Sequence, residues 1–132
     1  MKIFLSYRYT GEDPEEVREN VELICSALET AGHKSYCTFF DGQFFKGKDF
    51  SNKEILLHAF KEIKKADVLL AFVNSKEKSE GMLLEAGYAL ANKKPVYLLV
   101  REGVKTVFLR EMAEKIIDFK DTEKLPGLLK NI

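Results

Sequence analysis

A carboxylate in the second half of the chain stands where parallel α/β folds place reactive groups. Glu85 lies early in a predicted helix, residues 82–91, and an apolar run at residues 68–73 predicts a buried strand just before that helix. Open α/β sheets bind ligands beyond the carboxyl ends of their strands, and a helix N-terminus favours an ionised carboxylate. A carboxylate held there can act as a nucleophile or stabilise positive charge. Glu85 is therefore the candidate catalytic residue.

Residue types that bind sugars, phosphates and flat rings gather in the segments predicted to lie beside this carboxylate. The candidates for substrate binding are Ser6, Tyr7, Arg8, Tyr9, Gly11, Asp41, Ser79 and Gly81. Aromatic rings suit a flat base, whereas hydroxyls, backbone amides and arginine suit sugar oxygens or phosphate. A carboxylate beneath a sugar ring can attack its anomeric carbon or stabilise an oxocarbenium-like transition state. The set indicates cleavage or transfer at an N-glycosidic bond.

The elements that must position these residues alternate between strand and helix. Strand patterns cover residues 2–7, 34–40, 68–73, 95–100 and 116–119, and helix patterns follow them, the last three at residues 82–91, 107–114 and 123–130. Asp13 before Pro14 predicts the start of the first helix, and Ser51 with Glu54 matches a capping box that opens the second. Such alternation implies a parallel sheet with helices on both faces.

The predicted architecture is a single domain over residues 1–132, a flavodoxin-like three-layer α/β sandwich with a five-stranded parallel sheet of order 2-1-3-4-5. In that order the switch point lies between the first and third strands. The loops at residues 6–11 and 74–81 then face each other across a crevice, and the second strand delivers Asp41 to the same edge. Phe44 and Phe45 in the following loop predict a lid over a base or a dimer contact.

Composition argues against several partners. Lys+Arg and Asp+Glu both number 21, so the net charge of zero favours neither a nucleic acid polymer nor an anionic membrane. No apolar stretch has the length of a membrane span, and the N-terminus becomes polar too early for a signal peptide. Cys25 and Cys37 lack metal-site spacing and are interpreted as reduced thiols. We expect a cytoplasmic protein that acts on a small molecule and uses neither a metal nor a cofactor.

The pattern S-x-G-x-x-x-E-x-G-x-A, which begins at Ser79, resembles the nucleoside 2-deoxyribosyltransferase family, as does the Lys-Pro-Val segment at residues 94–96. This family includes 2′-deoxynucleoside 5′-phosphate N-hydrolases. The resemblance implies that Glu85 is the nucleophile, that Ser79 and Gly81 bind the 5′ end of the substrate, and that the loop at residues 6–11 encloses it. It also implies a homodimer.

The chain departs from the family pattern at two places. The family carries an aspartate, the proton donor to the leaving base, at the position of Ala59, so the neighbouring His58 is the candidate substitute. Loss of a general acid costs roughly 10²–10⁴-fold in rate. The nucleotide hydrolases also use a serine after the fourth strand, often from a second subunit, to bind phosphate. Residues 104–108 contain no serine, and Lys105 or Thr106 would have to serve.

A second resemblance concerns the N-terminal segment. Residues 3–7 with Gly11-Glu12-Asp13 are similar to the start of a Toll/interleukin-receptor (TIR) domain. TIR domains share the fold, and while some cleave NAD with a single glutamate, others are interaction modules. We predict an N-glycosidase acting on a nucleoside or nucleoside monophosphate, with hydrolysis favoured over deoxyribosyl transfer because nothing marks a second base site. The alternatives are a TIR-like NAD-cleaving domain and a non-catalytic nucleotide-sensing or interaction module.

Overall fold

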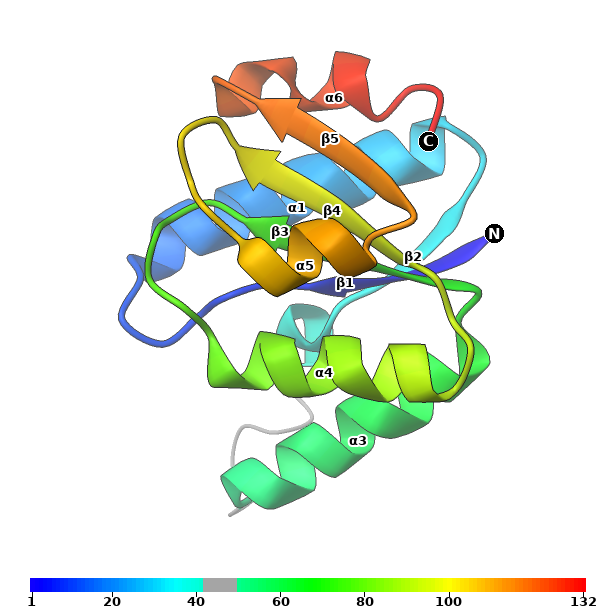
Figure 1. The fold of residues 1–132 in the computed structure, drawn as a ribbon. Helices are drawn as coiled ribbons and strands as arrows, with labels where there is room; N and C mark the ends of the chain where they lie inside the picture. The colour runs from blue at the N-terminus through cyan, green and yellow to red at the C-terminus, as the bar shows by residue number, and fades with distance from the viewer. Residues whose placement is uncertain (42–49) are drawn as a thin grey trace.

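The computed structural model describes residues 1–41 and 50–132, without the side chains of residues 40 and 41. Five parallel strands form one sheet: β1 (Lys2–Ser6), β2 (Lys34–Tyr36), β3 (Val68–Val73), β4 (Val96–Arg101) and β5 (Lys115–Phe119). Their order is β2-β1-β3-β4-β5 (Figure 1), which confirms the predicted flavodoxin-like topology. The expectation for Phe44 and Phe45 lies outside the described residues.

Helices cover both faces of the sheet and complete three layers (Figure 1). They are α1 (Pro14–Thr30), α3 (Asn52–Lys65), α4 (Glu80–Ala91), α5 (Val107–Met112) and α6 (Leu125–Leu128), with short 3-10 turns η1 (Thr38–Asp41) and η2 (Thr122–Lys124). The first and last helices, α1 and α6, share one apolar core with the sheet. The other core holds α3 and α4, and α5 packs against it.

The helix starts follow the predicted capping residues. Asp13 accepts a hydrogen bond from the Glu15 amide, and Ser51 and Glu54 form the reciprocal capping box. Ser79 caps α4 by accepting a hydrogen bond from the Met82 amide at 3.2 Å. Side-chain caps satisfy backbone donors that a helix leaves open at its first turn. The helix α4 therefore begins at Glu80, two residues before the predicted start.

Two predicted elements differ most from the structure. The second strand was expected over residues 34–40, but β2 ends at Tyr36 and η1 follows. Among the described residues its strand partner is β1, which pairs with it at three positions and continues to Ser6 after the chain has turned inward and buried Cys37. The final helix was expected over residues 123–130, but η2 precedes α6 there. Pro126 has no amide hydrogen and fits only the first turn of a helix.

Side-chain alternation along β1 decides which face the site occupies. Ile3 and Leu5 belong to the core beneath α1, whereas Phe4 belongs to the core beneath α3 and α4. Because successive side chains of a strand point to opposite faces, Ser6 points to the same side as Phe4. Ser6 is one of the few polar residues in the buried set, with 1% exposure. The last residue of β1 thus presents a hydroxyl to α4.

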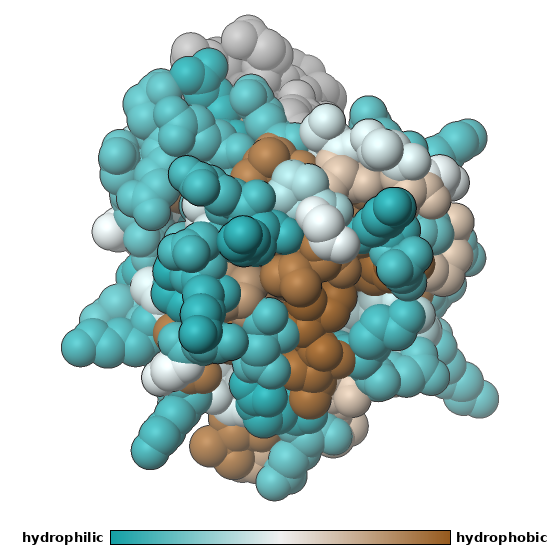
Figure 2. Space-filling view, turned by 90° about the horizontal axis from the view of Figure 1, so that it is seen from above, coloured by the Kyte–Doolittle hydropathy of each residue, from teal (hydrophilic) through white to brown (hydrophobic). Residues whose placement is uncertain are grey.

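The outer surface is polar with a local apolar area. Viewed from the side that carries α6, apolar residues gather in the middle of a mostly polar face (Figure 2). The α6 residue Leu128 keeps 40% exposure, because a helix of one turn covers little of the sheet. Within the described residues, no helix has both the length and the apolar character needed to cross a membrane.

Candidate active site

Ser6 and Glu85 meet at the carboxyl end of the sheet. The Ser6 hydroxyl donates a hydrogen bond of 2.6 Å to the Glu85 Oε1. Ser6 comes from the end of β1 and Glu85 from the second turn of α4, 79 residues later in the chain. A hydroxyl donor to a carboxylate makes a short, charge-assisted bond. The sheet therefore fixes the orientation of the candidate catalytic carboxylate, as the topology predicted.

Burial changes the pKa of the Glu85 carboxyl group. Desolvation raises the pKa of Glu85 from 4.5 to about 7, and the Ser6 hydrogen bond opposes part of that shift. Burial disfavours the charged form of a carboxyl group, whereas a donated hydrogen bond favours it. Near neutral pH, Glu85 is thus divided between its protonated and ionised forms. Catalytic carboxyl groups are commonly tuned into this range.

Two of the predicted aromatic residues lie beside this pair. Burial raises the pKa of the Tyr7 hydroxyl well above its usual range, and the hydroxyl faces Cys37 and Thr38. The rings of Tyr7 and Tyr9 both pack on Phe39, with centroid separations of 6.2 and 6.5 Å. Tyr7 is partly buried and remains protonated, whereas Tyr9 is 50% exposed. Together they form an aromatic border on the β1 side of the crevice.

Arg8 is engaged by an acidic residue that the sequence did not single out. Its Nη1 pairs with the Glu12 carboxylate at very short range, and the same carboxylate oxygen accepts a hydrogen bond of 3.2 Å from Ser75 Oγ. Gly11 adopts a φ of +82°, and a Cβ there would approach Arg8 Nη2 to 3.1 Å. Glu12 therefore links the loop after β1 to the loop after β3.

Ser79 and Gly81 begin α4 on the other side of the crevice. Apart from its own helix, a Cβ at Gly81 would meet only Ser79 Oγ, at 4.0 Å, and the φ of Gly81 is not positive. Neither packing nor backbone conformation requires glycine here. Open space above an exposed glycine at a helix start lets a ligand approach the backbone amides closely.

A cavity of about 260 Å³ opens next to these residues. It reaches from Tyr7 and Arg8 to Ser79 and continues between α1 and α5. Glu85 and Ser6 do not line it, but Met82, one helical turn before Glu85, does. The cavity therefore extends the crevice from the N-terminus of α4 toward the loop after β4.

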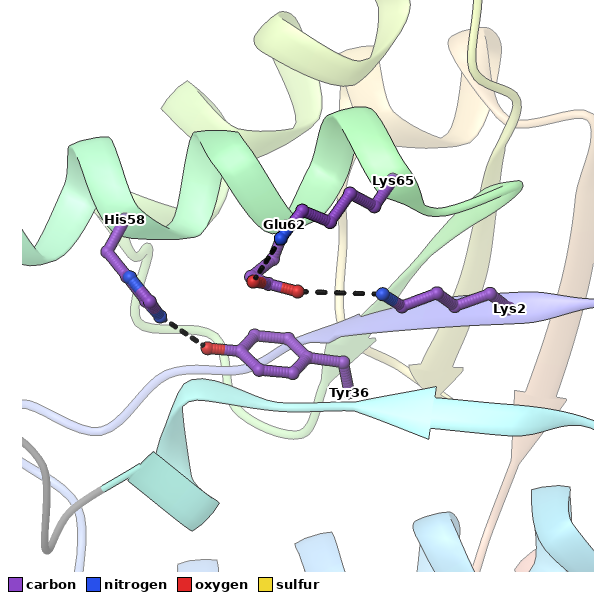
Figure 3. A network of polar contacts seen from close by, with 5 residues as sticks. All are labelled: Lys2, Tyr36, His58, Glu62 and Lys65. Carbon is purple, nitrogen blue, oxygen red and sulfur yellow. Dashed lines mark hydrogen bonds and ion pairs between the residues drawn. The ribbon is translucent and has the colours of Figure 1, made fainter.

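His58, the predicted proton donor, belongs to a different group of side chains. Its Nε2 lies 3.0 Å from the Tyr36 hydroxyl at the end of β2 (Figure 3). Farther along α3, Glu62 pairs with Lys2 and Lys65 at 3.6 and 3.4 Å. Ala59, where the family carries an aspartate, is 1% exposed and packs in the core shared with α4.

The remaining candidates stay predictions. Asp41 ends η1, and its side chain lies outside the described part of the structure. Thr106 precedes α5 and lines the cavity, and its buried hydroxyl has no hydrogen-bond partner among the described residues. Asn74, at the mouth of the cavity, accepts a hydrogen bond of 2.9 Å from Arg101 Nε. Asn74 belongs to no spacing pattern that would have marked it, and the sequence marked Glu12 only through the similarity of Gly11-Glu12-Asp13 to the start of a TIR domain.

Comparison with a family model adds evidence that does not depend on this geometry. Residues 7–120 match the model described as nucleoside 2-deoxyribosyltransferase. That range covers the loop after β1, the capped start of α4 and Glu85. No curated protein matches the chain.

Solved structures with the same fold cover nearly the whole chain. The CMP N-glycosidase BcmB of Clostridium botulinum is 20% identical with a TM-score of 0.73, and the match covers 100% of both chains. A 2-deoxyribosyltransferase of Bacillus psychrosaccharolyticus is 18% identical with a TM-score of 0.73, covering 96% of this chain and 91% of the other. The solution structure of BlsM is 21% identical with a TM-score of 0.76, covering 98% and 86%.

Proposed function

The chain belongs to the nucleoside 2-deoxyribosyltransferase family, and from this premise we propose that it cleaves the N-glycosidic bond of a nucleoside or nucleoside monophosphate. The family contains enzymes that act on nucleosides or nucleotides. The observation that carries the proposal is the hydrogen bond from Ser6 to Glu85, because it fixes a carboxylate at the switch point of the sheet. Hydrolysis is favoured over transfer since no second base site is marked.

The proposed reaction has two displacements. Ionised Glu85 attacks the anomeric carbon while the carbon–nitrogen bond breaks, and the base leaves with the electron pair and takes up a proton. A water molecule then attacks the glycosyl ester, so its hydroxyl joins the sugar and Glu85 is regenerated. Ser6 holds Oε1, and the described residues provide no hydrogen-bond donor to Oε2. We therefore assign the attack to Oε2.

The surrounding residues bind the rest of the substrate in this proposal. Tyr7 and Tyr9 border the base, while Ser79 and the amide of Gly81 contact the 5′ end. Arg8, held by the Glu12 carboxylate, and Gly11 close the same end from the loop after β1. Asp41 ends η1 at this edge of the sheet and stays a proposed substrate contact.

His58 stays the proposed proton donor, because it lies on α3, which packs beside the α4 helix that carries Glu85. The ring of Phe60 on α3 stacks on Tyr88 of α4 with a centroid separation of 4.1 Å. Both helices run antiparallel to the parallel strands that they connect, so they run parallel to each other. Leu57 on α3 and Glu85 on α4 each lie three residues before the stacked rings, so they stand at the same level along the two helices. His58 is one residue from that level, or about 1.5 Å along the axis, and its ring would have to leave the Tyr36 hydroxyl to reach a leaving base.

Replacing His58 with glutamine should lower the rate of base release by roughly 10²–10⁴-fold for ordinary nucleosides, because the base then leaves without a proton donor. The loss should nearly vanish for 7-methylguanosine, whose cationic base needs no proton to depart. The measurement is kcat for both substrates. His33→Gln is the matched control, since His33 contacts the N-terminal amine and Ile132 at the far edge of the sheet. Equal losses for both substrates would contradict the assignment.

Base release tests the whole proposal. The protein is incubated with ribo- and 2′-deoxynucleosides, their 5′-monophosphates and NAD, and free base is measured by chromatography. Release from a nucleoside or monophosphate supports the proposal, and transfer to an added second base identifies a transferase. Release from NAD alone would favour the TIR-like alternative. Binding without release from any compound would favour a sensing module.

We also propose that two copies associate through α5. Three apolar side chains of this short helix face solvent: Val107 with 67% exposure, Phe108 with 79% and Met112 with 55%. Leu83 of α4 is 45% exposed and lines the same cavity mouth as Val107 and Phe108. Contiguous exposed apolar residues mark association surfaces. A second copy of the same face would cover them.

The substitution Phe108→Glu should convert the dimer into a monomer. A charge in the centre of an apolar interface typically weakens it by about 2 kcal/mol or more, which is roughly 30-fold in the dissociation constant. Light scattering after size-exclusion chromatography measures the mass. Leu128→Glu on α6 makes the same chemical change on the other face and should leave the mass unaltered. A wild-type monomer, or a dimeric Phe108→Glu variant, would refute the assignment.

A further inference from the structure

We propose that the cavity beside Glu85 binds an uncharged, apolar 5′ substituent, so that the preferred substrate is a nucleoside carrying a group such as a 5′-thioether rather than a 5′-phosphate. This inference rests on the proposed N-glycosidase function and names its substrate class. It comes from the position, the lining and the charge of the cavity.

The position of the cavity matches the 5′ end of a nucleoside held over Glu85. Ser79 and Tyr7 border both the crevice and the cavity, and Met82 lies one turn before Glu85 on the same helix. A sugar whose anomeric carbon faces Glu85 and whose 5′ carbon faces Ser79 therefore directs any 5′ substituent into this space.

The walls of the cavity are largely apolar and come from both helical layers. The apolar lining residues are Val17, Val21, Phe72, Val73, Met82, Leu83, Val104, Val107, Phe108 and Leu109. Val21 and Phe72 are 1% and 6% exposed and belong to the core beneath α1, so the inner wall of the cavity is part of the packed interior. Burying a phosphate dianion against such a surface would require compensating charge, whereas an alkyl group gains from the burial.

The least exposed cation among the described lining residues already has a partner. Arg8 pairs with Glu12, and Ser75 fixes that carboxylate from the opposite loop. The other charged lining residues are the exposed Lys76, Lys78 and Lys105, which stand with Glu16 and Glu77. Positive and negative groups nearly cancel over the whole lining. A phosphate would have to displace Glu12 from Arg8, and an uncharged group would not.

Two polar atoms give the cavity a limited hydrogen-bonding capacity. The buried Thr106 hydroxyl has no partner among the described residues, and Asn20 on α1 is 7% exposed in the opposite wall. A buried polar group without a partner is costly. A thioether or ether group in the 5′ substituent carries no charge and needs few hydrogen bonds, so this lining can accommodate it.

The test compares three forms of one nucleoside: adenosine, 5′-deoxy-5′-methylthioadenosine and adenosine 5′-monophosphate, together with the same series in 2′-deoxyribose. We expect kcat/KM for the thioether to exceed that for the monophosphate by at least about tenfold, the typical value of a methylene in an apolar pocket. A preference for the monophosphate would overturn the inference and leave the N-glycosidase proposal standing. Release of base from none of the compounds would instead defeat the underlying function.

Substitutions in the cavity lining provide a second test of the same inference. Val104, on the loop after β4, is partly buried and has room to change. Val104→Phe fills the cavity and should lower the thioether-to-adenosine ratio of kcat/KM by about tenfold, while Val104→Ala should not lower it. Glu12→Gln frees Arg8 and should raise the monophosphate-to-adenosine ratio. Unchanged ratios in folded variants, verified by circular dichroism, would contradict the assignment of the cavity.

Discussion

Replacing Glu85 with glutamine should abolish base release, with a fall in kcat of at least about 10³-fold, because removal of an enzymatic nucleophile leaves only binding and electrostatic contributions. Glutamine has nearly the same shape and accepts the hydrogen bond of 2.6 Å from Ser6, so the geometry of the site is kept. The variant should therefore still bind the substrate. Release of free base, measured by chromatography under saturating substrate, gives kcat directly.

Glu80→Gln provides the matched control for this loss. Glu80 lies five residues before Glu85 on the same helix, is exposed, and undergoes the same chemical change. Its activity should stay within about twofold of wild type, since surface substitutions away from special features have small effects. Equal activity of wild type and Glu85→Gln would exclude Glu85 as the nucleophile. A similar loss of activity in Glu80→Gln would show that activity responds to any such substitution in α4, and not specifically to loss of the reacting carboxylate.

The parts of the fold that the sequence predicted well are those with local signals. The strand β3 is buried on both faces, so its unbroken apolar run marks its bounds at residues 68 and 73. Ser51 and Glu54 predict the start of α3, because these two residues contact each other within one helical turn. The strand β2 was overestimated because it leaves its neighbour β1 after the Phe4–Tyr36 pair, which is a fact of tertiary packing and not of composition.

The same distinction separates the predicted and unpredicted parts of the site. Glu85 stood out because a motif of eleven residues surrounds it. By contrast, Glu12 and Ser75 meet across 63 residues of chain, and no spacing rule connects two loops. The cavity arises where α1 of one layer and α5 of the other approach the ends of β3 and β4, so it depends on tertiary packing alone.

Glu85 should also reduce the stability of the folded protein as the pH rises. The folded chain holds the Glu85 proton up to about pH 7, whereas an unfolded chain releases it near the ordinary value of 4.5. Between those values the native state binds more protons than the unfolded state, so the free energy of unfolding falls with increasing pH. Above about pH 7 both states are ionised, and the full cost of the buried charge, up to about 3 kcal/mol, is present.

Glu85→Gln removes this titration and should therefore stabilise the protein most at alkaline pH. Urea unfolding followed by circular dichroism should show a gain in the free energy of unfolding of up to about 3 kcal/mol at pH ~8, shrinking toward zero at pH ~5. Glu80→Gln should show no such trend, because Glu80 is exposed. A gain independent of pH, or a variant less stable than wild type at both values, would mean that the protein does not hold this carboxyl group in a desolvated state. If one substitution removes activity and raises the free energy of unfolding, the protein holds this carboxyl group for its reaction at a cost in stability.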